Sequence, residues 1–132
     1  MAELAGLVLL DTSALLALRD DEPGADRVAE LLEGPRPCLA CFMTRMEVLY
    51  RVWKDEGEPA GRLAHEQLLA LPLQWVEFSN PLLEGAAALK AQHALSLADA
   101  WIAAAAQQAG AQLLHKDPEF RSIAGLHQEW LG

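Results

Sequence analysis

The sequence predicts a single α/β domain in which a parallel sheet is covered by helices on both faces. Short apolar runs that are typical of strands alternate with longer stretches in which apolar residues recur at helical spacing. The chain has 132 residues, of which 52% are hydrophobic, and this suits one compact unit with a sizeable core. We therefore expect residues 1–132 to form one domain.

Five apolar runs have the length and composition of β-strands. The first, Leu7–Leu10, contains no polar residue, which predicts a central strand buried on both faces. The others are Cys38–Phe42, Leu73–Phe78, Gln112–His115 and Leu126–Trp130. The stretches between the runs are long enough for helices, which favours parallel pairing of the strands.

Helical patterns fill the stretches between these strands. Along Thr44–Glu56 an apolar stripe lies opposite charged residues, and we expect the stripe to face the core. Its members are Met46, Leu49, Tyr50 and Trp53. We also expect Trp75, in the third strand, to pack in the core. The other predicted helices are Arg62–Leu71, Pro81–Ala94 and the alanine-rich Leu97–Ala109, which Gly110 ends.

The charge of the chain restricts how it could bind nucleic acid. A formal net charge of −9 argues against a broad phosphate-binding surface, because such surfaces depend on Lys and Arg. Bound divalent cations would cancel part of the acid locally. Six basic residues are also sequence neighbours of the acidic motifs described below: Arg36, Arg45, Arg51, Lys54, Lys116 and Arg121.

Cys38 and Cys41 are the only cysteines. They lie in a predicted strand, where residues three apart point to opposite faces and cannot share a ligand. We expect two buried free thiols rather than a redox or zinc pair.

No apolar stretch approaches the roughly 18 residues that a membrane span needs, and the first residues carry acid instead of a basic segment. The sequence therefore predicts a cytoplasmic protein without a membrane partner.

Four short motifs place a carboxylate where a helix begins. They are Asp11-Thr12-Ser13, Thr44-Arg45-Met46-Glu47, Ser96-Leu97-Ala98-Asp99 and His115-Lys116-Asp117-Pro118. Each motif alone also fits a helix cap. In a parallel sheet, however, every strand-to-helix turn emerges at the carboxyl edge, so at least three of these acids should meet there. Asp99 follows another helix, and only the tertiary fold can bring it to that edge.

Acids gathered in this way indicate a site for a hard cation. Without compensation they repel one another and raise one another's pKa. Oxygen ligands without His or Cys suit Mg²⁺ or Mn²⁺, which take phosphate oxygens as further ligands. Such ions also activate water, so the expected chemistry is phosphoryl transfer.

The same motifs resemble those of the PIN-domain family. The resemblance rests on Leu10-Asp11-Thr12-Ser13, Thr-x-x-Glu ending at Glu47, Ser96-x-x-Asp99-Ala100 and Asp117-x-x-Phe120, and it spans nearly the whole chain. It implies a three-layer α/β/α fold with four or five parallel strands, and Mg²⁺ or Mn²⁺ as the cofactor. By this resemblance Asp11, Glu47, Asp99 and Asp117 are the catalytic, metal-binding acids, and Ser13 is a supporting hydroxyl.

The compact size is most similar to that of VapC-type toxins of toxin–antitoxin pairs, which implies an endoribonuclease with RNA as its substrate. Water activated by the metal would attack phosphorus in line, the 3′ oxygen would leave, and the products would carry 5′-phosphate. The resemblance also implies a cognate antitoxin protein and a homodimer.

Three other functions fit parts of the pattern. A catalytically silent PIN-like module would use the acidic rim to bind a basic peptide, and a metal-dependent phosphatase would act on small molecules. A receiver-type phospho-acceptor domain also gathers acids at a sheet edge, but this chain lacks the early acidic pair of that class.

One position departs from the family pattern. The family often has Thr or Ser two residues before its last acid, and this sequence has His115 there. We expect the His115 ring to pack at the end of its strand rather than to contact phosphate.

Overall fold

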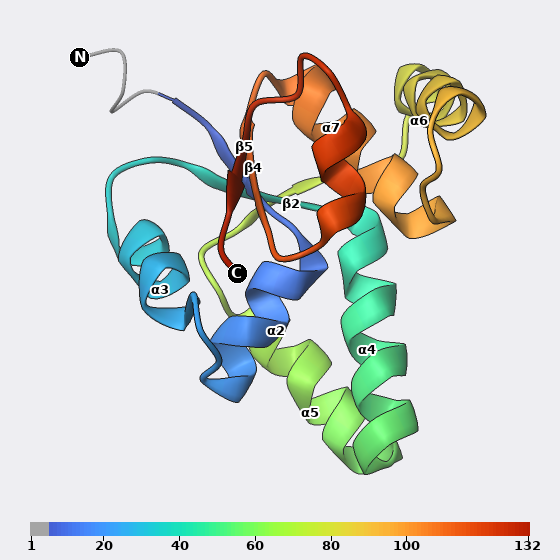
Figure 1. Ribbon diagram of the computed structural model, residues 1–132. Helices are drawn as coiled ribbons and strands as arrows, with labels where there is room; N and C mark the ends of the chain where they lie inside the picture. Colours follow the sequence, from blue (N-terminus) through green and yellow to red (C-terminus); the bar gives the residue numbers. More distant parts are fainter. Residues whose placement is uncertain (1–5) are drawn as a thin grey trace.

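The computed structural model describes residues 6–132, which form a five-stranded parallel sheet between two layers of helices (Figure 1). The strands are β1 (Val8–Leu10), β2 (Cys38–Cys41), β3 (Gln74–Val76), β4 (Gln112–His115) and β5 (Gln128–Trp130). Their order across the sheet is β3-β2-β1-β4-β5. The predicted α/β/α fold with a parallel sheet is confirmed, and β1 is the central strand as expected.

Within residues 6–132, seven helical segments connect and flank the strands. They are α2 (Thr12–Asp20), α3 (Ala25–Glu33), α4 (Phe42–Glu56), α5 (Glu58–Leu69), α6 (Asn80–Gln92), α7 (Leu97–Ala109) and the short 3-10 helix η1 (Pro118–Ser122). No helix of the described part of the chain is long and apolar enough to cross a membrane.

The sheet has a hydrophobic core on each face, and alternate residues of the central strands belong to one core or the other. In β1, Leu9 packs with α6 and α7 on one face, whereas Val8 and Leu10 pack with α2, α3, α4 and α5 on the other. The two cysteines divide in the same way, since Cys41 belongs to the first core and Cys38 to the second. Both are buried free thiols, as the sequence predicted.

The alanine-rich helix α7 forms the centre of the first core. Ile102 and the run Ala103–Ala106 are buried, and small side chains at these positions let the helix lie close to the sheet. The helix ends at Gly110, whose φ of +64° is the left-handed conformation typical of a glycine cap. This helix also carries Asp99 in its first turn.

The helices α4 and α5 form a hairpin that projects from the sheet (Figure 1). The turn between them is Gly57, at φ +98°. Pro59 lies in the first turn of α5, where proline is favoured, so α5 begins earlier than the sequence indicated. At Gly61 an added Cβ would lie 2.8 Å from the backbone nitrogen of Trp53 and 2.9 Å from the carbonyl oxygen of Leu49. The close approach of the two helices therefore requires glycine there.

The apolar stripe of α4 does not face the core, and this expectation was wrong. Met46, Tyr50 and Trp53 are 59%, 45% and 40% exposed. The buried residues of α4 are instead Thr44, Glu47, Val48 and Val52. Polar side chains occupy part of the buried face because they belong to the site described below, so apolar spacing alone indicated the wrong side of the helix.

The two tryptophans expected in the core differ: Trp75 packs against the second core while partly buried, whereas Trp53 is largely outside it, and each contacts an arginine. The Arg62 guanidinium carbon lies 5.3 Å from the Trp53 ring centroid. Trp75 is half-buried, with the guanidinium carbon of Arg45 4.8 Å from its ring centroid. Both pairs have the geometry of cation–π contacts.

We expect Gly61→Ala to lower the free energy of unfolding by about 1 to 3 kcal/mol, because the new methyl group meets backbone atoms of α4 that cannot move independently. Urea denaturation measures the change. Gly85→Ala in α6 is the matched control, since its Cβ would lie 3.6 Å from the Cβ of Ala104, an ordinary contact. That variant should be unchanged or up to about 1 kcal/mol more stable. Equal destabilisation by both substitutions would contradict this account of the α4–α5 contact.

Candidate metal centre

Four acids predicted from the sequence converge at the carboxyl edge of the sheet. Asp11 directly follows β1 and caps α2, and Asp117 follows β4 and caps η1. Glu47 lies in the second turn of α4, which begins where β2 ends. Asp99 reaches the same edge because α7 packs against the start of α4, where the rings of Phe42 and Trp101 are 5.2 Å apart.

Asp11 is buried with one carboxylate oxygen used and one free. Its Oδ2 accepts hydrogen bonds from the backbone N–H of Ser13, at 3.0 Å, and from the Ser13 hydroxyl. Its Oδ1 is the one buried side-chain oxygen or nitrogen within residues 6–132 that has no hydrogen-bond partner. Burial, with smaller contributions from the charges of Glu47 and Asp117, raises the pKa of Asp11 to about 6.

Ser13, predicted as a supporting hydroxyl, joins two of the strand ends. While its hydroxyl donates to Asp11, its Oγ accepts the backbone N–H of Lys116 at 2.9 Å. Residues after β1 and after β4 are therefore tied together through a single side chain, which fixes the separation of the turns that carry Asp11 and Asp117.

Glu47 is held by two threonines. The Thr12 hydroxyl donates to Oε1 of Glu47 at 2.6 Å, and the hydroxyls of Thr12 and Thr44 are 2.9 Å apart. Because the Thr12 proton points to the carboxylate, the Thr44 hydroxyl donates to Thr12. The other oxygen, Oε2, lies 3.7 Å from Nη2 of Arg51. The Glu47 carboxylate is thus held in one orientation by Thr12 on one oxygen and faces Arg51 with the other.

Asp99 forms a tight group with Asp117 and Glu119, in which one carboxylate oxygen of each residue lies within 4.8 Å of the others. Burial raises the pKa of Asp99 to about 10. Hydrogen bonding in which the protonated Asp99 donates to the carboxylates of Asp117 and Glu119 acts in the same direction, as do the charges of Asp11 and Asp117. In the absence of a cation, Asp99 is therefore protonated at neutral pH.

Glu119 was missed by the sequence analysis, because it belongs to none of the four motifs. Its Oε1 accepts the backbone N–H of Ser96 at 3.0 Å, and the Ser96 hydroxyl accepts the backbone N–H of Asp99 at 3.1 Å. Ser96 therefore caps α7, but the acid that completes this reciprocal pair comes from η1 and not from Asp99. The position of Glu119 in the first turn after the Asp117-Pro118 cap was the available signal.

His115 is fully buried and packs as expected. Its ring centroid lies 4.9 Å from that of Phe120 and 5.7 Å from that of Trp130, with edge-to-face geometry. Burial is the largest effect on its pKa and lowers it, so the ring is neutral at neutral pH.

The basic residues near the acidic motifs in sequence are distributed unevenly in space. Arg36 lies at the opposite, amino edge of the sheet, where it donates to the carbonyl oxygen of Gly6 and to the side chain of Gln112. Arg45 is paired with Glu77 at 3.1 Å. Arg51, whose side chain is 44% exposed, pairs with Glu47 of the centre.

The donor set fits a hard divalent cation. Its closest group is formed by the carboxylates of Asp99, Asp117 and Glu119, and Asp11 and Glu47 lie outside that group. The buried, unpartnered Oδ1 of Asp11 is nearby, since the charge of Asp11 contributes to the raised pKa of Asp99. Buried polar atoms without partners are rare in folded proteins unless an ion or water satisfies them. Asp11, Glu47, Asp99, Asp117 and Glu119 are the residues that could hold the ion, and oxygen ligands favour Mg²⁺ or Mn²⁺.

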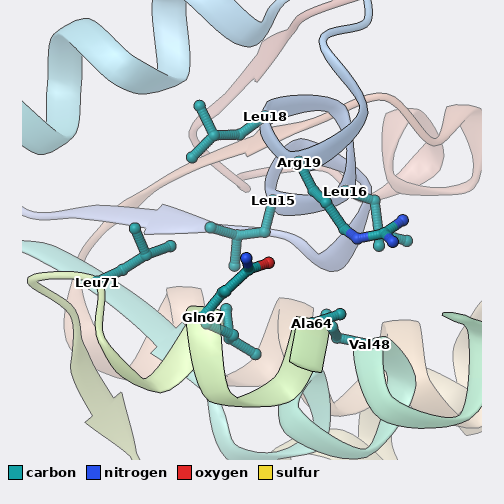
Figure 2. Close-up of a pocket in the computed structure, with 9 residues that line it drawn as sticks. Leu15, Leu16, Leu18, Arg19, Val48, Ala64, Gln67 and Leu71 are labelled. Atoms are coloured by element: carbon teal, nitrogen blue, oxygen red, sulfur yellow. The ribbon is translucent and has the colours of Figure 1, made fainter. Parts of the chain in front are cut away.

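An apolar groove lies between α2, α4 and α5 (Figure 2). Leu15 points from α2 towards Gln67 of α5, and Val48 of α4 forms part of the floor. Because α2 begins beside Asp11 and α4 carries Glu47, the groove and the acidic centre share two helices.

Comparison with known proteins gives one family. The sequence model of the PIN domain matches residues 8–126. No curated protein sequence matches the chain.

Several solved structures share the fold. A VapBC2 complex from Rickettsia felis, bound to a DNA fragment of its promoter, contains a chain with a TM-score of 0.78 and 17% identity, and the match covers 96% of this chain and 99% of that one. A toxin–antitoxin complex from Klebsiella pneumoniae gives 0.69 and 27%, with coverage of 90% and 94%. VapC20 from Mycobacterium tuberculosis, a toxin that cleaves the sarcin–ricin loop, gives 0.72 and 18%, with coverage of 90% and 95%.

The raised pKa values predict how stability depends on pH without metal. Unfolding lets Asp11 and Asp99 ionise at their ordinary pKa of about 4. The metal-free protein should therefore lose stability as pH rises above about 4, up to about 6 for Asp11 and about 10 for Asp99. Asp99→Asn removes the larger effect. In EDTA at pH 8 it should be about 0.5 to 2 kcal/mol more stable than the parent, whereas at pH 4 the two should match.

Thermal melts in EDTA and in excess Mg²⁺ measure this difference, and Mg²⁺ should raise the melting temperature of the parent more than that of Asp99→Asn. Ser96→Ala is the control, because loss of a helix cap costs about 1 kcal/mol at either pH and with or without metal. An Asp99→Asn variant that behaves like Ser96→Ala would mean that Asp99 only supports its helix.

Proposed function

The chain belongs to the PIN-domain family, and from that premise we propose that it is a metal-dependent endoribonuclease of the VapC type, the toxin of a toxin–antitoxin pair. The observation that carries the proposal is the set of carboxylates at one sheet edge with a buried, unpartnered oxygen on Asp11. Burial, together with the neighbouring carboxylates, raises the pKa of Asp11 and of Asp99, so ionising these two groups destabilises the metal-free protein.

We assign Asp11, Glu47, Asp99 and Asp117 as the metal-binding acids, with Glu119 as an additional candidate. When bound there, Mg²⁺ or Mn²⁺ would lower the pKa of a water molecule and neutralise charge on the phosphate. Ser13 and Thr12 orient the carboxylates of Asp11 and Glu47 towards the centre. Without a cation the pKa of Asp99 is raised to about 10, so a cation held by Asp99 would have to displace its proton, and binding would release that proton to solvent.

RNA binding would use the few exposed cations near the centre. Arg51 lies beside Glu47 with its side chain partly exposed, which suits a contact with a phosphate next to the bond that is cut. The net charge of −9 means that affinity for RNA should depend strongly on the divalent ion.

The purified protein should cleave RNA in Mg²⁺ or Mn²⁺ and stop when EDTA is added, and the products should carry 5′-phosphate. Asp99→Asn or Asp11→Asn should lower the rate by at least about 100-fold, since loss of residues outside the first ligand shell already costs 10- to 100-fold. Ser122→Ala, in η1 with its hydroxyl bonded only to the Glu119 carbonyl oxygen, is a control that should retain activity. Gel assays with end-group analysis measure both properties.

Cleavage that is insensitive to EDTA would remove the metal mechanism, and 2′,3′-cyclic phosphate ends would show that the ribose hydroxyl is the nucleophile. Metal-dependent release of phosphate from small esters, without RNA cleavage, would favour a phosphatase. Metal binding without any cleavage would leave the acidic rim as a protein-binding surface.

We also propose that the protein forms a homodimer and binds a cognate antitoxin. The antitoxin is suggested by the toxin–antitoxin complexes among the structural relatives. We propose the apolar groove of Figure 2 as its binding site. For the dimer, the proposal is supported by exposed apolar side chains on and next to α6 and α7. Leu97 of α7 is 69% exposed, and Leu83 of α6 and Phe78, just before α6, are also exposed.

Light scattering should find a dimer at micromolar concentrations. Leu97→Asp should weaken dimerisation by about 10- to 100-fold, because burial of a leucine contributes about 1.5 to 3 kcal/mol. Leu69→Asp is the matched control, since Leu69 is also exposed but lies on α5. A parent that is strictly monomeric, together with no co-purification of the product of an adjacent gene, would count against both partners.

A further inference from the structure

We infer that His115 is a positioning residue for the acidic centre, and that its Nδ1 atom fixes the backbone of Asp117 in the place where the family often uses a hydroxyl. This inference rests on the proposed function, because the metal-binding role of Asp117 is itself proposed. It also goes beyond that function, since it explains why a buried histidine occupies this position.

His115 belongs to a chain of hydrogen bonds that runs from Asp117 to Phe120, and the donors and acceptors at its two ends are fixed. The backbone N–H of Asp117 donates to Nδ1 of His115 at 3.2 Å, and Nε2 of His115 lies 2.8 Å from Oε1 of Gln128. The Gln128 amide nitrogen donates to the carbonyl oxygen of Phe120 at 2.9 Å. A backbone N–H can only donate and a carbonyl can only accept. The ring is therefore neutral with its hydrogen on Nε2, and Nδ1 presents a lone pair to Asp117.

The hydrogen bond between His115 and Asp117 closes a tight turn of the backbone. An acceptor on residue i that takes the N–H of residue i+2 is the turn that Ser, Thr, Asn and Asp side chains form. His115 makes this turn with Asp117, and Asp117 repeats it through Oδ1 and the N–H of Glu119, at 2.9 Å. The imidazole thus begins a series of two turns that sets the positions of two acids in the centre.

Aromatic neighbours hold the His115 ring in place. His115 is fully buried and lies against Phe120 and Trp130, and the guanidinium carbon of Arg121 is 4.7 Å from the Trp130 ring centroid. Within residues 6–132, His115 is the only acceptor for the Asp117 N–H. Loss of Nδ1 would leave that N–H unsatisfied and free the turn to move.

Two measurements test the inference without relying on RNA cleavage. Long-range ¹H–¹⁵N NMR at about pH 8, where histidine is neutral, should show the hydrogen of His115 on Nε2. Manganese binding, followed by EPR, should weaken by about tenfold in His115→Leu, which has no acceptor. His115→Thr and His115→Asn provide an acceptor for the same turn and should bind Mn²⁺ within about threefold of the parent, although all three variants lose the ring.

This comparison separates positioning from packing. If only ring packing matters, the three variants should weaken Mn²⁺ binding equally, and that result would overturn the inference, as would a hydrogen found on Nδ1. Val28→Ala, in α3 within the other core, controls for general destabilisation and should bind Mn²⁺ normally.

If His115→Leu does not fold, Gln128→Met supplies the test. This variant keeps the ring but removes the amide that fixes its tautomer. It should populate the Nδ1–H form and weaken Mn²⁺ binding by up to about tenfold, and unchanged binding with a mixed tautomer would overturn the inference. A parent that binds no Mn²⁺ would instead contradict the proposed function, so the two failures are distinguishable.

Discussion

The crowding of carboxylates at the carboxyl edge of the sheet is the constraint on which the rest of the structure depends. Parallel strands end at the same edge, so the turns after β1 and β4 bring Asp11 and Asp117 together, and α4 and α7 add Glu47 and Asp99. Burial and neighbouring negative charge oppose ionisation of Asp11 and Asp99, and a protonated Asp99 is one response. The hydroxyls of Ser13 and Thr12 are another, because they stabilise the charge on the neighbouring carboxylates.

Helix capping and metal binding are compatible roles for these acids, because a carboxylate has two oxygens. Asp11 caps α2 through Oδ2 and leaves Oδ1 free, while Asp117 accepts the N–H of Glu119 through Oδ1 alone. Capping therefore orients the second oxygen instead of consuming it. Glu119 also has both roles, because it accepts the backbone N–H of Ser96 at the start of α7 and belongs to the acidic centre. Sequence motifs that look like caps can thus be the means by which ligands are aimed.

The sequence predicted those features that depend on local pattern. The strands, the parallel sheet, the ends of α7 and the placement of Asp11 and Asp117 follow from apolar runs, the Gly110 cap and strand-to-helix turns. Features that depend on tertiary packing were not accessible. Apolar spacing assigned Trp53 to the core, but the buried face of α4 is set by Thr44 and Glu47, which face the acidic centre. Glu119 was missed because its partner, Ser96, is distant in sequence and only the fold joins them.

The distribution of charge explains why a cation is central to any interaction with a polyanion. Six of the ten Lys and Arg residues lie within ion-pair distance of a carboxylate of the chain: Arg19, Arg27, Arg45, Arg51, Arg62 and Lys116. Little positive charge is therefore left over for phosphate, and Arg36 is at the opposite edge of the sheet. A divalent ion among the clustered acids reverses this locally, because it neutralises the carboxylates and presents positive charge at the point where they meet. The turns fixed by Ser13 and His115 matter for the same reason, since the oxygens must hold their spacing in the absence of the ion if they are to bind it without rebuilding the edge.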